Sequence, residues 1–113
     1  MNSPMTGGAG IKRSGTRSER IVKQNFESFG WKVVRSGASL GSADLICFKN
    51  GGVLLVQVKR RTGTEKYKSD AAEIEHFPVY VVTDFGRGDF RIDRSGSIIT
   101  KETRTLKEFL LNA

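Results

Sequence analysis

The chain has 113 residues, enough for one compact domain, and 37% of them are hydrophobic, so wholesale disorder is excluded. No apolar run approaches the roughly 20 residues that cross a bilayer, and a single cysteine excludes an internal disulfide framework or a cysteine-based zinc cluster. Nineteen Lys and Arg against twelve Asp and Glu give a net charge of +7. This charge favours a polyanionic partner over a membrane surface, with a basic solvent-exposed surface as the alternative interpretation.

The N-terminus, residues 1–15, is rich in glycine and serine and lacks the apolar stretch of a signal peptide. We expect it to be a flexible basic segment of a cytoplasmic protein. A helix is predicted next, because Thr16 and Glu19 have the spacing of a capping box and Val22, Phe26 and Phe29 recur at helical intervals. Gly30, which follows the last of these, is expected to end the helix.

Three strands are predicted after this helix, at residues 31–35, 43–48 and 53–59, with a loop of small residues at 36–42. Asn50-Gly51-Gly52 separates the last two strands and is a strong hairpin signal. The third strand is apolar on both faces, which indicates a central strand covered from both sides. Cys47 lies within an apolar run and is expected to be a buried core residue.

The second half of the chain predicts a short helix near residues 65–76, with His76 at its exposed end. Strands are expected at 79–83 and 89–93, turns at 86–88 and 94–96, and a last helix at 103–111. No internal repeat or domain boundary interrupts this order. We therefore expect residues 16–113 to form one α/β domain, in which helices pack against a central sheet.

The hairpin brings three polar side chains together in strands that are otherwise apolar. A turn at residues 50–51 places Asp44 opposite Gln57, and Lys59 lies two residues further along the same face. A turn at residues 51–52 places Asp44 opposite Lys59, with Gln57 diagonal to it. In either register the three side chains converge on one face.

Two interpretations of this cluster are open, because a buried charge is costly unless it is paired or binds a ligand. Asp44 and Lys59 can form a structural ion pair that ties the two strands together. Alternatively, Asp44 and Gln57 can hold Mg²⁺ with water and phosphate oxygens. Lys59 would then orient or deprotonate an attacking water, or stabilise charge in the transition state.

A family resemblance is carried by Arg35-Ser36-Gly37-Ala38-Ser39, Ser42-Ala43-Asp44-Leu45-Ile46 and Val56-Gln57-Val58-Lys59. Together these runs resemble the PD-(D/E)xK nuclease core. With Glu19-Arg20 on the preceding helix, they are more narrowly similar to the archaeal-type Holliday junction resolvases. The resemblance covers residues 12–61. It implies a restriction-endonuclease-like α/β core, with a central mixed β-sheet flanked by α-helices.

The resemblance implies roles for individual residues. Glu19, Asp44 and Gln57 would bind Mg²⁺, with Mn²⁺ as a substitute, and no small-molecule cofactor is expected. Lys59 would be the catalytic lysine, and Ser36 or Ser39 would act in the loop near the scissile bond. The cations that we expect to contact the DNA backbone are Lys12, Arg13, Arg17, Arg20, Arg35, Arg60 and Arg61.

Three positions limit the resemblance. Glu19 would be useful in a capping box without any chemistry. Ser42 stands where the family name places proline, a minor loss at a turn. Gln57 stands where Glu or Asp is usual; its amide keeps one oxygen ligand but loses a negative charge, which should weaken metal affinity. A chain that binds DNA without cutting it is therefore an open alternative.

The function that the resemblance implies is metal-dependent hydrolysis of phosphodiesters in four-way junctions, by a structure-selective DNA endonuclease of recombination and repair. The alternatives are a nuclease of the same core with another DNA substrate, a non-catalytic DNA-binding module, or a plain α/β domain with a basic face. The expected partners are branched DNA and a second copy of the chain, because two opposed strands must be cut; no membrane is involved. The cell would be archaeal, bacterial or virus-infected. The residues that are either dimer contacts or core are Tyr67, Phe77, Tyr80, Phe85 and Phe90.

Overall fold

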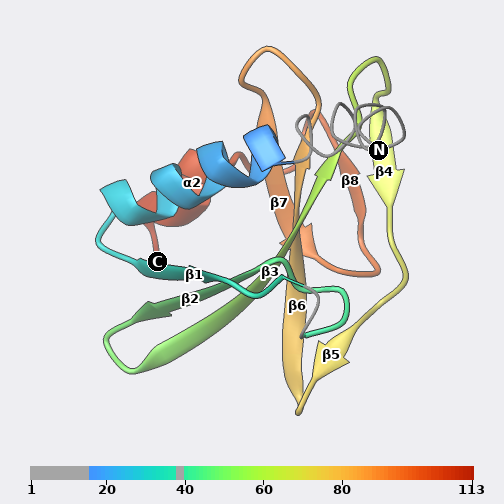
Figure 1. The fold of residues 1–113 in the computed structure, drawn as a ribbon. Helices are drawn as coiled ribbons and strands as arrows, with labels where there is room; N and C mark the ends of the chain where they lie inside the picture. The colour runs from blue at the N-terminus through green and yellow to red at the C-terminus, as the bar shows by residue number, and fades with distance from the viewer. Residues whose placement is uncertain (1–15, 38–39) are drawn as a thin grey trace, which may run out of the picture.

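The computed structural model describes residues 16–37 and 40–113, so the expected flexible segment at 1–15 lies outside the described residues (Figure 1). An N-terminal helix runs through residues 16–28. The other elements are β1 (Lys32–Arg35), β2 (Leu45–Lys49), β3 (Gly52–Arg60), β4 (Lys66–Lys68), β5 (Glu73–Ile74), β6 (Phe77–Asp84), β7 (Phe90–Arg94), β8 (Ile98–Thr100) and α2 (Leu106–Leu111). No described helix is both long and apolar enough to span a membrane.

The main sheet is mixed, as the sequence predicts. Its order is β1-β2-β3-β6, and both β5 and β7 also pair with β6. Only the β3–β6 pair is parallel among these ladders, with Leu55 opposite Val79. β3 is the longest strand and lies in the middle of the sheet, because its side chains are apolar on both faces.

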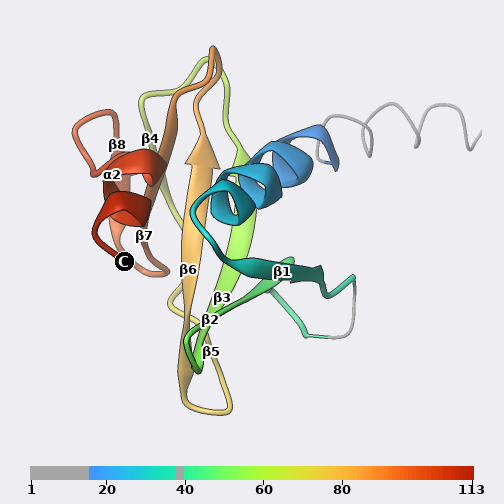
Figure 2. The same cartoon turned by 90° about the vertical axis from the view of Figure 1, so that its left-hand side faces the viewer.

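The two faces of the sheet are covered differently. The N-terminal helix and α2 pack on the same face, where Val22, Phe26, Val56 and Leu110 belong to one buried cluster (Figures 1 and 2). On the opposite face of β6, the small β4–β8 sheet contributes Ile99 to another cluster, with Val81 of β6 and Phe85 just after it. The expected mixed sheet with flanking helices is therefore confirmed, and strands cover part of the other face.

The predicted helix at residues 65–76 is wrong. In its place β4 pairs with β8, with Tyr67 opposite Ile99, and β5 pairs with the start of β6. Glu75 and His76 both have positive φ, 52° and 72°, and form the tight turn between β5 and β6. His76 is therefore an exposed turn residue and not a helix end. The apolar side chains in this segment gain more from pairing with distant strands than from a helix of their own.

The helix boundaries also differ from the prediction. Residue 16 is already helical, so Thr16 is not the N-cap, and the predicted capping box with Glu19 is wrong. A complete capping box occurs instead at α2, where Thr105 is the N-cap and Glu108 is its partner. The strand β8 was not predicted, because its three residues separate two short turns.

One buried contact ties the N-terminal helix to the sheet. The Ser18 hydroxyl donates a hydrogen bond of 2.8 Å to Oδ2 of Asp84, at the end of β6. Both residues are almost fully buried, with exposed fractions of 2% and 7%. This contact fixes the first described turn of the helix against the end of the sheet where Asp44 and Lys59 lie.

Candidate active site

Asp44 is positioned by the β2–β3 hairpin. Lys49 pairs with Gly52, so the turn is at Asn50-Gly51, the first of the two registers considered. Both turn residues have positive φ, 51° and 80°, as a two-residue hairpin turn with right-handed strand twist requires. Leu45 pairs with Val56 at the end of this ladder, and Asp44 directly precedes it.

The Asp44 carboxylate is oriented by the main chain of β3. The Asp44 N–H donates to the Val56 carbonyl at 2.8 Å, and the Val58 N–H donates to Asp44 Oδ2 at 2.8 Å. One carboxylate oxygen of Asp44 is therefore held by the main chain of β3. Gln57 and Lys59 are both half-buried and alternate with Val58 along β3, so they share the face predicted from the sequence.

Glu19 reaches the same site from the N-terminal helix. Its Oε1 accepts a hydrogen bond of 3.1 Å from Nη2 of Arg35, at the end of β1. The Arg35 side chain is 53% exposed and the Glu19 side chain 22%, so the arginine keeps donors toward solvent while the carboxylate is largely covered. Glu19, Arg35, Gly37 and Asp44 line one cleft of about 370 Å³.

The electrostatics of the two carboxylates show that the cleft disfavours their negative charge. Burial raises the pKa of Asp44, against the lowering effects of the Val58 N–H, Lys59 and Arg35. Burial and then the charge of Asp44 raise the pKa of Glu19, although Arg35 opposes the shift. The arginine and lysine therefore do not fully compensate the two carboxylates, and a cation in the cleft would favour their ionised forms.

The donor set fits a divalent cation that keeps most of its water. Within residues 16–37 and 40–113, no third acidic, histidine or cysteine side chain joins Glu19 and Asp44. Mg²⁺ is usually held by one or two carboxylates together with water and substrate phosphate oxygens. Two carboxylates, with the Gln57 amide on the adjoining strand, meet that requirement without a closed protein cage.

The loop between β1 and β2 closes beside Asp44. The Ser36 hydroxyl donates to the Ala43 carbonyl, and the Ser36 N–H donates to the Asp44 carbonyl at 2.9 Å. Ser36 thus lies next to the cleft, as expected, while Ser39 lies outside the described residues. Gly37, with φ of 61°, lines the cleft and was not singled out from the sequence.

The predicted DNA-contacting cations fall into groups. Arg17, Arg20 and Arg60 are exposed, and Arg35 is exposed while it pairs with Glu19. The guanidinium of Arg61 lies 4.5 Å from the ring centre of Tyr67, so part of it is engaged within the domain. Lys12 and Arg13 lie outside the part of the chain that the structure describes.

Two features of the site had no signal in the sequence. The Val58 N–H is a main-chain donor, which any residue other than proline supplies, so only the fold reveals its role. Thr83 is fully buried opposite Lys59 in the β3–β6 ladder, and its hydroxyl has no hydrogen-bond partner in the described part of the chain. A hydroxyl on the face that carries Lys59 could be found only once the parallel register was known.

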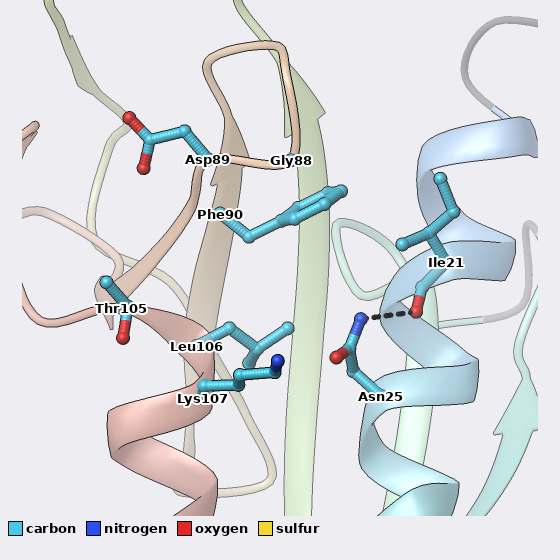
Figure 3. A pocket seen from close by; sticks show the side chains of 8 residues that line it. All are labelled: Ile21, Asn25, Gly88, Asp89, Phe90, Thr105, Leu106 and Lys107. Carbon is cyan, nitrogen blue, oxygen red and sulfur yellow. Dashed lines mark hydrogen bonds between the residues drawn. The ribbon is translucent and has the colours of Figure 1, made fainter.

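Other candidate centres are excluded by their surroundings. Cys47 is fully buried, and burial raises the pKa of its thiol to about 12, so it is a core residue and not a thiolate nucleophile. A cavity of about 390 Å³ lies between the N-terminal helix, the β6–β7 turn and the start of α2 (Figure 3). The one carboxylate of its lining, that of Asp89, is bonded to Nε of Arg91 at 2.6 Å.

Comparisons with known proteins bear on the family and the fold of the chain. Residues 10–102 match the model of a family described as archaeal Holliday junction resolvase (Hjc). Among solved structures, the Holliday junction resolvase Hjc of the archaeal hyperthermophile Archaeoglobus fulgidus superposes with a TM-score of 0.64. The match covers 84% of this chain and 98% of that one at 17% sequence identity, so it shows the fold alone. No curated protein matches the chain.

The raised pKa of Asp44 leads to a stability prediction. The folded state binds this proton more tightly than the unfolded chain, so stability falls as pH rises from the ordinary value of 3.8 through the raised pKa. Asp44→Asn removes the charge and keeps an oxygen for the Val58 N–H. We expect it to raise the free energy of unfolding at neutral pH, measured by urea denaturation, with the difference vanishing below the ordinary pKa.

The exposed Asp70→Asn is the control for this measurement and should change stability little at either pH. A lower stability of Asp44→Asn at neutral pH would contradict the prediction and favour the structural Asp44–Lys59 ion pair.

Proposed function

This chain belongs to the archaeal Holliday junction resolvase family, and we propose that its Glu19–Asp44–Lys59 cleft hydrolyses phosphodiesters of four-way DNA junctions in a divalent-metal-dependent reaction. The family match supports a junction-resolving endonuclease. The observation that carries the site assignment is the convergence of two incompletely compensated carboxylates with Arg35 around one cleft, with Lys59 close enough to act on the charge of Asp44. We assign Mg²⁺, with Mn²⁺ as a substitute, because all the available ligands are hard oxygens.

The proposed chemistry follows from the placement of each group. A water oxygen forms a bond to phosphorus, the ester P–O bond breaks, and the leaving oxygen takes up a proton. A metal ion held by Glu19, Asp44 and the Gln57 oxygen would neutralise phosphate charge and acidify the attacking water. The Lys59 ammonium is near enough to Asp44 to oppose the rise in the pKa of that carboxyl. In this proposal it donates to a phosphate oxygen as negative charge grows there.

Arg35 has a positioning role in this proposal. Its bond to Glu19 holds both side chains at the rim of the cleft, and its exposed donors can bind a neighbouring phosphate oxygen. The Val58 N–H holds Oδ2 of Asp44, a residue that lines the cleft. In this proposal Arg35 binds the DNA backbone, and the main chain of β3 orients the metal ligand Asp44.

The first functional prediction concerns Asp44 and Lys59. With Mg²⁺, the purified protein should nick a synthetic four-way junction symmetrically, and chelation should stop the reaction. Asp44→Ala and Lys59→Ala should each lower the single-turnover rate by about 10²- to 10⁴-fold, while junction affinity stays within a few-fold of the parent. Lys32→Ala, at an exposed position on β1, is the control and should cut normally.

If Asp44→Ala and Lys59→Ala both cut like the parent protein, the site assignment is wrong. A panel of junction, flap and linear duplex separates the substrates within the same assay. Faster cutting of a flap or a linear duplex than of the junction would favour a nuclease of this core with another target.

The second prediction concerns Gln57, which distinguishes an enzyme from a DNA-binding module. Gln57→Glu adds a negative charge beside Asp44 and should therefore lower the Mg²⁺ concentration that gives half-maximal cleavage. Without metal, the added carboxylate should weaken junction binding slightly through repulsion of phosphate. A protein that shows no cleavage with either residue, but binds junctions tightly, would be a non-catalytic module.

We further propose that the chain acts as a homodimer, since two opposed strands must be cut and the described residues supply one such cleft. Three exposed apolar residues lie on the sheet face that the helices leave uncovered: Val34 (45%), Phe48 (41%) and Val53 (37%). Phe48 pairs directly with Val53, and Phe77, 47% exposed, precedes by two residues the Val79 that pairs with Leu55. Such a contiguous apolar patch supports association.

Four of the five aromatic residues that are either dimer contacts or core belong to the core. Phe85 is buried, and Tyr67, Tyr80 and Phe90 are partly buried and packed against core clusters. Phe77 alone among the five is an exposed large hydrophobic residue. It is therefore the aromatic residue of this set that we assign to the dimer surface.

The double variant Phe48→Glu/Phe77→Glu tests the dimer. Two carboxylates in an apolar interface should shift the protein from dimer to monomer in sedimentation equilibrium. Junction cleavage should then change from paired cuts to single nicks. Ile98→Glu is the matched control, because Ile98 is 57% exposed on β8 and outside this patch. A parent that sediments as a monomer, or a double variant that stays dimeric, would contradict this assignment.

A further inference from the structure

A second charged cavity, of about 380 Å³, lies on another side of the N-terminal helix. Three arginines from separate segments line it: Arg17 of the helix, Arg60 at the end of β3 and Arg87 in the β6–β7 turn. We call it the arginine pocket. Arg17 and Glu19 are two residues apart, so their side chains point roughly 200° apart around the helix. The helix thus separates the arginine pocket from the catalytic cleft.

The Asp84 carboxylate lines the arginine pocket and contacts three segments around it. Its Oδ2 accepts from the Ser18 hydroxyl at 2.8 Å, and its Oδ1 accepts from the Gly86 N–H at 2.8 Å. The Nε of Arg60 lies 4.0 Å from Oδ2, at the outer limit of an ion pair. The buried carboxylate therefore fixes the helix, the turn and Arg60 relative to one another, but its oxygens are engaged mainly by neutral donors.

The three arginines retain the capacity to bind an anion. The Arg60 side chain is 46% exposed, and Arg17 and Arg87 are also exposed. Across the residues that the structure describes, the side chains of Arg17 and Arg87 neither donate a hydrogen bond nor form an ion pair. Three guanidinium groups facing one carboxylate leave a net positive cavity, and their planar forks suit phosphate oxygens.

The backbone at Arg87 indicates that its side chain has a role. Arg87 has φ of 57°, between Gly86 at 101° and Gly88 at 77°. A left-handed conformation is unfavourable for a residue with a Cβ, and glycine or asparagine would adopt it more readily. An arginine therefore does not help to form this turn, but the turn aims its side chain at the cavity that Arg17 and Arg60 line.

The arginine pocket and the catalytic cleft lie at the same end of the sheet. Arg60 follows Lys59 and pairs with Asp84, while Asp44 directly precedes β2, two strands away from β6. With strands about 4.8 Å apart, the two sites are separated by about 10 Å. The wall formed by Ile21, Gly88 and Phe90 is shared with the neighbouring cavity, across which the Phe90 ring points toward the helix (Figure 3).

We propose that the arginine pocket is a second phosphate-binding subsite, which holds a backbone phosphate of the DNA strand near the phosphate that is cut in the cleft. This inference rests on the proposed function and adds Arg87 to the residues that bind DNA. Asp84 acts as a positioning residue, because it sets the mutual geometry of the cations without contacting the phosphate. The subsite contributes affinity and fixes where the strand lies relative to Asp44.

Arg87→Asn tests the subsite while preserving the turn, because asparagine tolerates positive φ. Binding of a four-way junction is measured without metal over a series of salt concentrations. We expect Arg87→Asn to weaken binding by about 3-fold or more at low salt and to reduce the slope of log affinity against log salt by about 0.9. Arg87→Lys should retain the slope but lose part of the affinity, because the charge remains without the fork.

The matched control is Arg94→Asn, which removes the same charge from an exposed arginine at the other end of β7. It should change neither the affinity nor the slope. Urea denaturation of Arg87→Asn should show a stability equal to or above that of the parent, which separates loss of the phosphate contact from loss of the fold.

If Arg87→Asn binds like Arg94→Asn while the parent still cuts junctions, the subsite is wrong and the proposed function stands. If the parent protein neither binds nor cuts a junction, the proposed function fails, and the subsite fails with it. If Arg87→Asn and Arg94→Asn both weaken junction binding, and by the same factor at every salt concentration, the loss reflects the overall charge of the protein. The arginine pocket is then not a phosphate site.

Discussion

The register of the β2–β3 hairpin is the constraint on which the catalytic cleft depends. Asn50-Gly51 supplies two residues at positive φ, which sets Lys49 opposite Gly52 and brings the Asp44 carboxylate to the Val58 N–H. Because side chains alternate with a period of two, a slip by one residue would move the polar positions of one strand to the other face. A local turn preference therefore determines where the carboxylate points.

The fold disfavours the negative charge of the two carboxylates in the cleft. Burial disfavours the charged forms of Asp44 and Glu19, and the nearby cations Arg35 and Lys59 only partly offset that cost. A structural ion pair would be arranged to compensate the charge fully, and its carboxylate would have a lowered pKa. The raised pKa values instead suit ligands whose ionised forms become favourable when a cation and a phosphate enter together.

Features with local signals could be predicted from the sequence. The helical repeat of Val22 and Phe26 and the Asn50-Gly51 turn each act within a few residues, so the helix and the hairpin were predicted correctly. Residues 65–76 were predicted wrongly, because β4 is stabilised by pairing with β8, some thirty residues away. The arginine pocket could be predicted only in part. Arg17 and Arg60 were among the cations expected to contact DNA, but Arg87 joins them only through the β6–β7 turn of the folded chain.

Three consecutive residues of the N-terminal helix connect these parts of the molecule. Successive side chains point roughly 100° apart, so Arg17 faces the arginine pocket, Ser18 faces the sheet and Glu19 faces the catalytic cleft. Since Ser18 is bonded to Asp84, the same buried contact sets the positions of the residues on either side of it. A phosphate bound by Arg17 would thus lie at a fixed separation from the cleft that contains Glu19. Rigid spacing of this kind converts affinity for the DNA backbone into alignment of the scissile bond.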